Sequence, residues 1–175
     1  MENVSAGAVK ELREKTGAGI MDCKKALQDA GGNMDKATEI LRQKGLATSS
    51  KVAGREAKQG LIESYIHTGG RIGALVEVNC ETDFVARTDE FRKLAREIAM
   101  QVASMNPSTI GTMEGEGDEP DALLNQEYIR DSRRTIRDLI KETIAQVREN
   151  IQVSRVMRFE VGMSGANTTT TESES

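Results

Sequence analysis

The spacing of apolar residues changes period along this chain. Up to Gly45 they recur at helical intervals, in three short runs that glycines separate. From Leu61 to Glu81 they alternate with polar residues, as in strands, and from Thr88 the helical interval returns. From Ile151 they alternate once more. This order predicts a helical module followed by an α+β module with the order strand, strand, helix, helix, strand.

We therefore divide the sequence into four parts. Residues 1–47 predict a three-helix module with tight glycine breaks, close to the lower size limit for independent folding. Residues 48–60 are polar and basic and are interpreted as a linker. Residues 61–163 form the predicted α+β core, and residues 164–175 have almost nothing to bury and predict a disordered tail.

Within the core, we expect three antiparallel strands with helices on one face. A glycine-bearing connection at 69–71 joins the first two strands, which is a hairpin signal. Glycine-rich, acidic residues 106–120 predict an exposed loop, and a helix is expected over 132–149. The last strand is expected to bury one apolar face, although Arg155 and Val156 interrupt its alternation. That predicted face comprises Ile151, Val153, Met157, Phe159 and Val161.

Composition and charge argue against several classes of function. The net charge is −4, whereas general nucleic-acid binders usually have a basic excess. No apolar stretch approaches the roughly 20 residues that span a bilayer, and the N-terminal segment lacks the features of a signal peptide. We expect a soluble protein that stays in the compartment of its synthesis, with Cys23 and Cys80 as free thiols.

The sequence contains no recognisable reaction centre. Its single histidine, His67, lies at a predicted strand end, and the two cysteines have no zinc-site spacing. The glycines near Lys24 do not match a phosphate-binding loop and follow a helix instead of a strand. We therefore expect neither a metal nor a cofactor, and no enzyme.

Two segments carry alternatives that the pattern leaves open. In residues 16–25, Ile20 and Met21 either close the base of the helical bundle or form an apolar contact surface beside charges. In residues 81–87, Phe84 lies in a short strand-to-helix connection, as an inward core anchor or an outward wedge. Asp83 beside it is either a helix cap or a contact residue.

These two segments resemble signatures of a known family. LREKTGAGIMDCKKAL, residues 12–27, is similar to the N-terminal signature of bacterial and organellar elongation factor Ts. VEVNCETDFVAR, residues 76–87, resembles its second signature, and IQVSRVMRFEVG, residues 151–162, resembles its final strand. The matches occur in the family's order and involve both predicted modules.

The resemblance implies a guanine-nucleotide exchange factor without covalent chemistry, which binds elongation factor Tu and promotes GDP release during translation. It implies a ubiquitin-associated-like fold for the N-terminal module, which docks on the GTP-binding domain of Tu. It also implies that the Asp–Phe pair disturbs the magnesium and phosphate site. By position, the implied contacts are Arg13, Ile20, Met21, Asp22, Thr82, Asp83, Phe84 and Val85, with Asp83 and Phe84 as the wedge. The implied location is the bacterial cytoplasm, or the plastid stroma or mitochondrial matrix for an organellar protein.

The chain departs from the family pattern in one large feature. Most members have a long helical excursion, often with a second core subdomain, where this chain has a short loop. One sheet face is thus short of cover, and we expect a homodimer through the sheet. No small-molecule substrate, membrane or specific nucleic acid is expected as a partner. Two alternatives stay open: a non-exchanging adaptor, and an RNA-binding module that uses Arg130, Arg133, Arg134 and Arg137.

Overall fold

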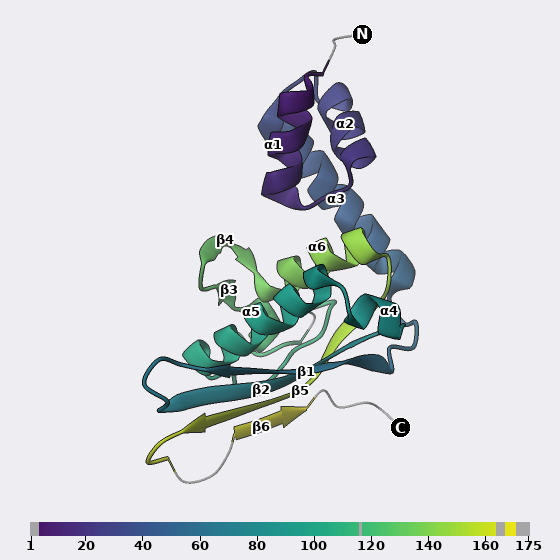
Figure 1. The fold of residues 1–175 in the computed structure, drawn as a ribbon. Coiled ribbons are helices and arrows are strands. Elements are labelled where there is room, and N and C mark those ends of the chain that lie inside the picture. The colour runs from purple at the N-terminus through teal and green to yellow at the C-terminus, as the bar shows by residue number, and fades with distance from the viewer. Residues whose placement is uncertain (1–3, 116, 164–166, 171–175) are drawn as a thin grey trace. The chain divides into compact units, whose positions relative to one another are not determined.

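The computed structural model describes residues 4–115, 117–163 and 167–170 (Figure 1). The chain divides into two compact units. The first contains residues 1–54 together with 141–148, and the second contains residues 55–140 and 149–175.

The first unit is a bundle of helices α1 (Ala6–Thr16), α2 (Ile20–Asp29) and α3 (Met34–Val52). Side-chain caps start two of them: Ser5 Oγ accepts from Ala8 N at 3.1 Å, and Asn33 Oδ1 accepts from Lys36 N at 2.9 Å. α3 continues into the segment that the sequence analysis interpreted as a linker. The helices enclose a small core of Leu12, Cys23, Ala26, Leu27 and Ala37.

The second unit is an antiparallel sheet with helices. Strands β1 (Gln59–Ile66), β2 (Ile72–Cys80) and β5 (Ile151–Glu160) are the three predicted strands, which confirms the α+β class. A fourth strand, β6 (Asn167–Thr170), pairs with β5, and the order is β1-β2-β5-β6. β6 falls within the tail that was predicted to be disordered. These four residues instead form a strand, because their backbone pairs with β5. The other residues of that tail, 164–166 and 171–175, lie outside the described part of the chain.

Helix α5 (Asp89–Met105) packs across β1, β2 and β5 and covers one face of the sheet (Figure 1). Thr88 caps it as expected, because its Oγ1 accepts from Phe91 N. A four-residue helix, α4 (Asp83–Ala86), precedes it.

The connection from α5 to β5 contains more than the predicted loop and helix. A 3₁₀ turn (Leu123–Asn125) leads into a hairpin of β3 (Glu127–Tyr128) and β4 (Asp131–Thr135), and α6 follows as Ile136–Val147. The helix predicted from residue 132 therefore begins four residues later. Thr135 N and Oγ1 both donate to Asp138 Oδ2, which fixes the helix start after the hairpin.

A β-bulge in β5 corrects the predicted buried face of that strand. Glu77 pairs with Arg155 and Val78 with Val153, so Ser154 is an extra residue. An extra residue shifts the alternation by one and moves the following side chains to the opposite face. Ile151, Val153 and Val156 are accordingly buried, and Arg158 Nε donates to Ala103 O of α5. Phe159 and Val161, predicted to be buried, are instead 52% and 57% exposed.

A buried amide joins α5 to the β3–β4 hairpin. Gln101 is fully buried; its Nε2 donates to Gln126 Oε1 and Glu127 O, and its Oε1 accepts from Ile129 N, all at 3.1 Å. Three of the four hydrogen-bonding positions of the amide are used by groups in the hairpin or directly before it, so this side chain fixes how the hairpin docks.

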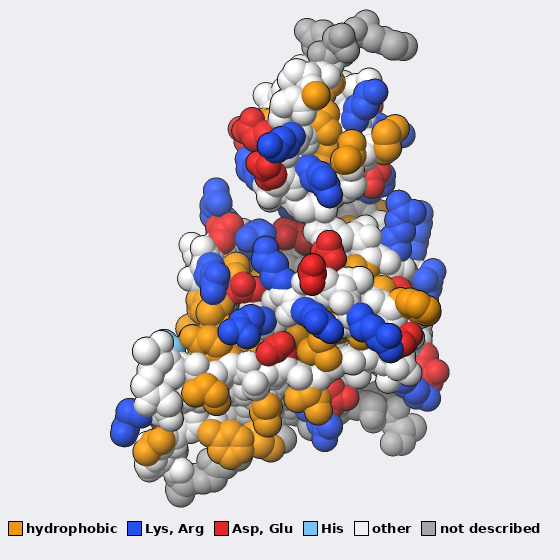
Figure 2. Space-filling view, in the orientation of Figure 1, with side chains coloured by type: hydrophobic (Ala, Val, Ile, Leu, Met, Phe, Trp, Pro, Cys, Tyr) orange, Lys and Arg blue, Asp and Glu red, His pale blue; other side chains and the backbone are white. Residues whose placement is uncertain are grey.

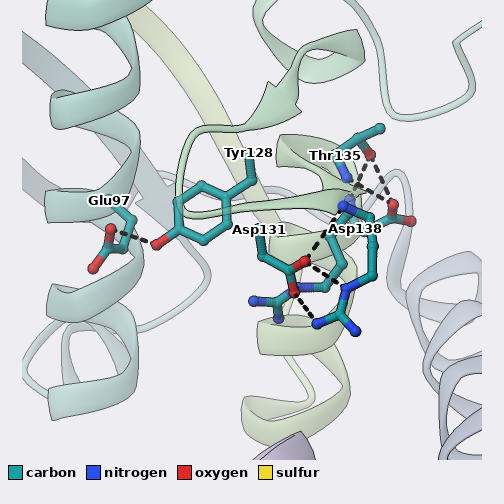
Figure 3. Close-up of polar contacts among 7 residues, drawn as sticks. Glu97, Tyr128, Asp131, Thr135 and Asp138 are labelled. Atoms are coloured by element: carbon teal, nitrogen blue, oxygen red, sulfur yellow. Dashed lines mark hydrogen bonds and ion pairs between the residues drawn. The ribbon is translucent and has the colours of Figure 1, made fainter.

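Charged contacts reinforce the same hairpin (Figure 3). Tyr128 Oη donates to Glu97 Oε2 at 2.6 Å, and burial, followed by this carboxylate, raises the pKa of Tyr128 to about 12. Asp131 accepts from Arg133 and Arg134, and the Arg133 hydrogen bond lowers the pKa of Asp131 to about 2. The hairpin is therefore held by polar contacts where it has few apolar residues.

We expect Gln101→Leu to destabilise the second unit by about 2–4 kcal/mol, because three buried hydrogen-bonding groups lose their partners. Urea unfolding followed by circular dichroism measures this cost. The control is Gln152→Leu at an exposed position of β5. Equal stability of the two variants would show that the hairpin does not depend on the buried amide.

Candidate functional site

The described residues contain no cluster that suggests catalysis. No group of three or more histidine, cysteine or acidic side chains could hold a metal ion there. Within the same residues, no helix is both long and apolar enough to cross a membrane. The search for a site therefore turns to apolar side chains that the fold leaves exposed.

Phe84 is the most exposed large apolar side chain of the described chain, with 79% of its surface accessible. It is the second residue of α4, between the end of β2 and the start of α5. By contrast, Phe91, seven residues later, is fully buried. Phe84 is therefore not an inward core anchor, because its ring lies on the surface.

The neighbours of Phe84 have separate parts in shaping α4. Thr82 is the N-cap, and its Oγ1 accepts from Val85 N at 3.4 Å. Asp83 is therefore not the cap; its Oδ2 accepts from Arg87 Nη2 at 2.7 Å, and about half of its side chain is exposed. The four predicted residues thus comprise the N-cap Thr82 and the first three residues of α4, which presents an aromatic ring beside a partly neutralised carboxylate.

The start of α4 is tied to the segment between α6 and β5. Glu149 Oε2 accepts from Glu81 N at 3.1 Å and from Thr82 N at 2.9 Å, while its Oε1 accepts from Thr82 Oγ1 at 2.6 Å. In return, Glu81 Oε1 accepts from Asn150 N at 2.7 Å. Sequence analysis did not find Glu149. Its partners become neighbours only through the pairing of β2 with β5, which places residue 80 opposite residue 151.

Cys80 is the last residue of β2, two residues before the N-cap Thr82. Its Sγ donates to Thr82 O at 3.1 Å, and it is fully buried. Burial, followed by the negative charge of Glu149, raises the pKa of the Cys80 thiol to about 11. The thiol therefore stays protonated at neutral pH and acts as a small buried hydrogen-bond donor, not as a nucleophile.

The predicted residues of the first unit also lie on its surface. Ile20 and Met21 are the first two residues of α2 and are 56% and 73% exposed, so they do not close the base of the bundle. Asp22 forms an ion pair with Lys44 of α3, and Arg13 is exposed on α1. The unit therefore offers an apolar tip surrounded by charges.

The four arginines of the RNA-binding alternative are engaged with acidic residues. Arg130 lies 3.4 Å from Glu97, Arg133 and Arg134 share Asp131, and Arg137 lies 2.8 Å from Asp118. Arg137 and Asp118 are also largely buried, and both hydrogen-bond the backbone of Thr112. These arginines organise the connection between α5 and α6 instead of forming a free basic face.

Comparison with known proteins identifies the family. The sequence model described as "Elongation factor TS" matches residues 44–115 and 81–169. Elongation factor Ts of Thermoanaerobacter sp. strain X514 is 48% identical over 204 aligned positions, which include 97% of this chain and all of that protein. Elongation factor Ts of Rippkaea orientalis is 50% identical, over 93% of this chain and 80% of that protein.

A third relative, elongation factor Ts of Carboxydothermus hydrogenoformans, is 45% identical over 91% of this chain and 89% of that protein. These alignments run over more positions than the 175 residues of this chain, so the relatives contain residues that have no counterpart here. Near-complete coverage at such identity leaves one assignment: this chain belongs to the elongation factor Ts family of translation elongation factors.

Proposed function

We propose that this protein is the guanine-nucleotide exchange factor of elongation factor Tu and works in the bacterial cytoplasm. The observation that carries the proposal is the outward Phe84 on a capped helix between β2 and α5. A soluble protein gains nothing for its own fold from an aromatic ring that is 79% exposed, so a partner surface is the natural place for it. No covalent step is part of this function.

Exchange requires differential binding. A factor releases GDP only if it binds the nucleotide-free state of Tu better than the GDP-bound state, and GDP must weaken its binding in return. Phe84 would insert beside the magnesium and phosphate site and displace the elements that order the metal. Asp83 beside it would oppose the anionic nucleotide at the same place. The phosphates then lose their counter-charge and GDP leaves faster.

The first unit supplies affinity in this proposal. Ile20 and Met21 form an exposed apolar tip, and Arg13 and Asp22 lie on the same unit. Such a surface binds the GTP-binding domain of Tu in the same way whether or not nucleotide is present. Uniform binding of this kind raises occupancy without changing the rate at which GDP leaves the complex.

We also propose that the protein is a homodimer. The bulge in β5 places Met157 and Phe159 on the sheet face opposite α5, beside Ile62, Ile66 and Leu75. Figure 2 shows part of this gathering of hydrophobic side chains over the strands. Glu77 and Arg155 lie on the same face and neutralise each other, since Arg155 Nε donates to Glu77 Oε2 at 2.6 Å. When the open faces of two copies meet, apolar area is buried and the Glu77–Arg155 pair leaves neither of these two charges unpaired. Two identical faces related by a two-fold axis are self-complementary.

We expect Phe84→Ala to lower the maximal rate of GDP release from Tu by about tenfold or more, because an aromatic anchor is lost. Its stability should stay within about 0.5 kcal/mol of the wild type, because the ring is exposed. Stopped-flow release of labelled GDP at increasing concentrations of the factor gives the maximal rate and the half-saturating concentration.

The control for that experiment is Phe91→Ala, which removes a buried ring and should cost about 3–5 kcal/mol in thermal unfolding. Unchanged release by a stable Phe84→Ala protein would refute the wedge.

In contrast, we expect Ile20→Ala combined with Met21→Ala to raise the half-saturating concentration by about tenfold and to leave the maximal rate near the wild-type value. The physical reason is that both side chains contribute affinity to both nucleotide states. The same stopped-flow titration measures this, with Met105→Ala as an exposed-methionine control. A fall in the maximal rate instead would assign the exchange step itself to the first unit.

For the homodimer, light scattering at micromolar concentration should give twice the mass of one chain. Leu75→Lys places a charge in the middle strand of the open face and should give a monomer of unchanged secondary structure. Met105→Lys, at the end of α5, is the control and should stay dimeric. A monomeric wild type that persists at high concentration would mean that water covers this face.

A further inference from the structure

The segment that ends in Phe84 depends on a carboxylate far along the chain. Glu149 is the second of three residues between α6 and β5, and it accepts three hydrogen bonds from Glu81 and Thr82. The preceding residue, Arg148, has a positive φ of 62° and ends α6. That left-handed turn directs the chain back toward β5 and places Glu149 opposite the end of β2.

The hydroxyl of Thr82 links this carboxylate to α4. An ionised carboxylate has no proton to give, so in the contact with Glu149 Oε1 the hydroxyl must donate. Its lone pairs are then oriented to accept from Val85 N, one of the orphan donors in the first turn of α4. Glu149 therefore fixes the rotamer of the cap, and the cap fixes the helix that holds Phe84.

The contact is closed in both directions. Glu81 Oε1 accepts a hydrogen bond from Asn150 N, and Arg55 Nη1 lies 3.5 Å from the same oxygen. Asn150, only 3% exposed, donates from Nδ2 to Arg55 O at 2.7 Å. The connection after β2, the connection before β5 and the start of the second unit at Arg55 are thus joined by hydrogen bonds between side chains and backbone groups. Each of the two connections contributes one carboxylate, Glu81 and Glu149.

We propose that Glu149 is the positioning residue of the exchange wedge: it sets the direction of α4 and of Phe84 without itself touching the partner. This inference rests on the proposed exchange function. The reason is that the ring of Phe84 is 79% exposed and has little packing of its own, so its direction follows that of α4, which the Thr82 cap and the buried Ala86 hold in place.

The test is Glu149→Gln, which keeps the size of the side chain and one accepting oxygen. Its amide nitrogen faces donors and cannot accept from them, so at least one hydrogen bond to the loop is lost. We expect the maximal rate of GDP release to fall about tenfold, as for loss of a charge-assisted hydrogen bond, while the half-saturating concentration changes less than about twofold. A role in general stability would move both quantities or neither.

A second readout needs no partner protein. The chain has no tryptophan, so Phe84→Trp introduces a single fluorescent reporter at the wedge. In that background, Glu149→Gln should lower the steady-state anisotropy of the indole and speed hydrogen exchange at the amides of Glu81 and Thr82. Unchanged anisotropy and unchanged exchange at both amides would overturn the proposal whether or not the protein acts on Tu.

Matched variants complete the design. Glu119→Gln removes a charge from an exposed position of the α5–α6 connection and should change none of these readouts. Thr82→Val removes only the hydroxyl and should lower the maximal rate about three- to tenfold, whereas Thr82→Ser keeps the hydroxyl and should restore it. If Glu149→Gln does not fold, this threonine pair decides, and equal rates for Val and Ser overturn the proposal.

The outcomes separate the two levels of inference. A wild-type protein that does not speed GDP release refutes the proposed function, while the anisotropy and amide exchange still report on the role of Glu149 in holding α4. Normal release by Glu149→Gln, with a loosened Phe84→Trp reporter, would show that Glu149 holds α4 but that GDP release does not depend on it. This result refutes its role in positioning the wedge for exchange and leaves the exchange function intact.

Discussion

The antiparallel pairing of β2 with β5 is the contact on which the second unit depends. It joins segments that lie some seventy residues apart, and it sets two features at once. At one end of the pair, Cys80 lies opposite Ile151, so the connection after β2 meets the connection before β5 and the hydrogen bonds of Glu149 become possible. In the middle of the pair, Ser154 is an extra residue that shifts the alternation of β5 by one. Odd-numbered residues therefore lie on the α5 side before the bulge, and even-numbered residues lie there after it. A displaced register would therefore lose both the cap of α4 and the burial of Val156.

The bulge also decides which side chains β5 adds to the open face of the sheet. Without it, Met157 and Phe159 would lie with Ile151 and Val153 under α5, and β5 would contribute Val156 in their place to the face of Ile62, Ile66 and Leu75. With it, Val156 fills the helix-covered face, while Met157 lies beside Leu75 on the open one. Arg158 is the next residue of β5 after Val156 on the side that α5 covers. Its guanidinium donates to Ala103 O and so satisfies a carbonyl near the end of the helix. An apolar open face is costly for an isolated chain, and it is the physical basis for the proposed homodimer.

Much of this structure follows from periodicity, and its failures have identifiable causes. The helices of the first unit, the hairpin of β1 and β2, and the caps Ser5, Asn33 and Thr88 were predictable because local pattern and capping chemistry agree. The buried face of β5 was not predictable, because a single bulge reverses the alternation of the strand after Val153. The β3–β4 hairpin was missed because it depends on Gln101, a buried amide that looks like one more polar residue of a helix. The outward direction of Phe84 was undecidable from pattern alone, and Glu149 was invisible because its partners lie far away in sequence.

The value of a rigid wedge follows from the thermodynamics of exchange. A ring free to sample many directions could settle on both the GDP-bound and the empty partner surface, and its contribution to the two states would tend to cancel. In the proposed exchange function, only a ring held in one direction would clash with the ordered metal site and fit the disordered one, and that difference would drive release. Holding it in advance also avoids an ordering cost at the moment of binding. α4 is too short to provide that rigidity through its own hydrogen bonds. The carboxylate of Glu149, attached to a central strand of the sheet, connects the ring to the most extensively paired part of the fold.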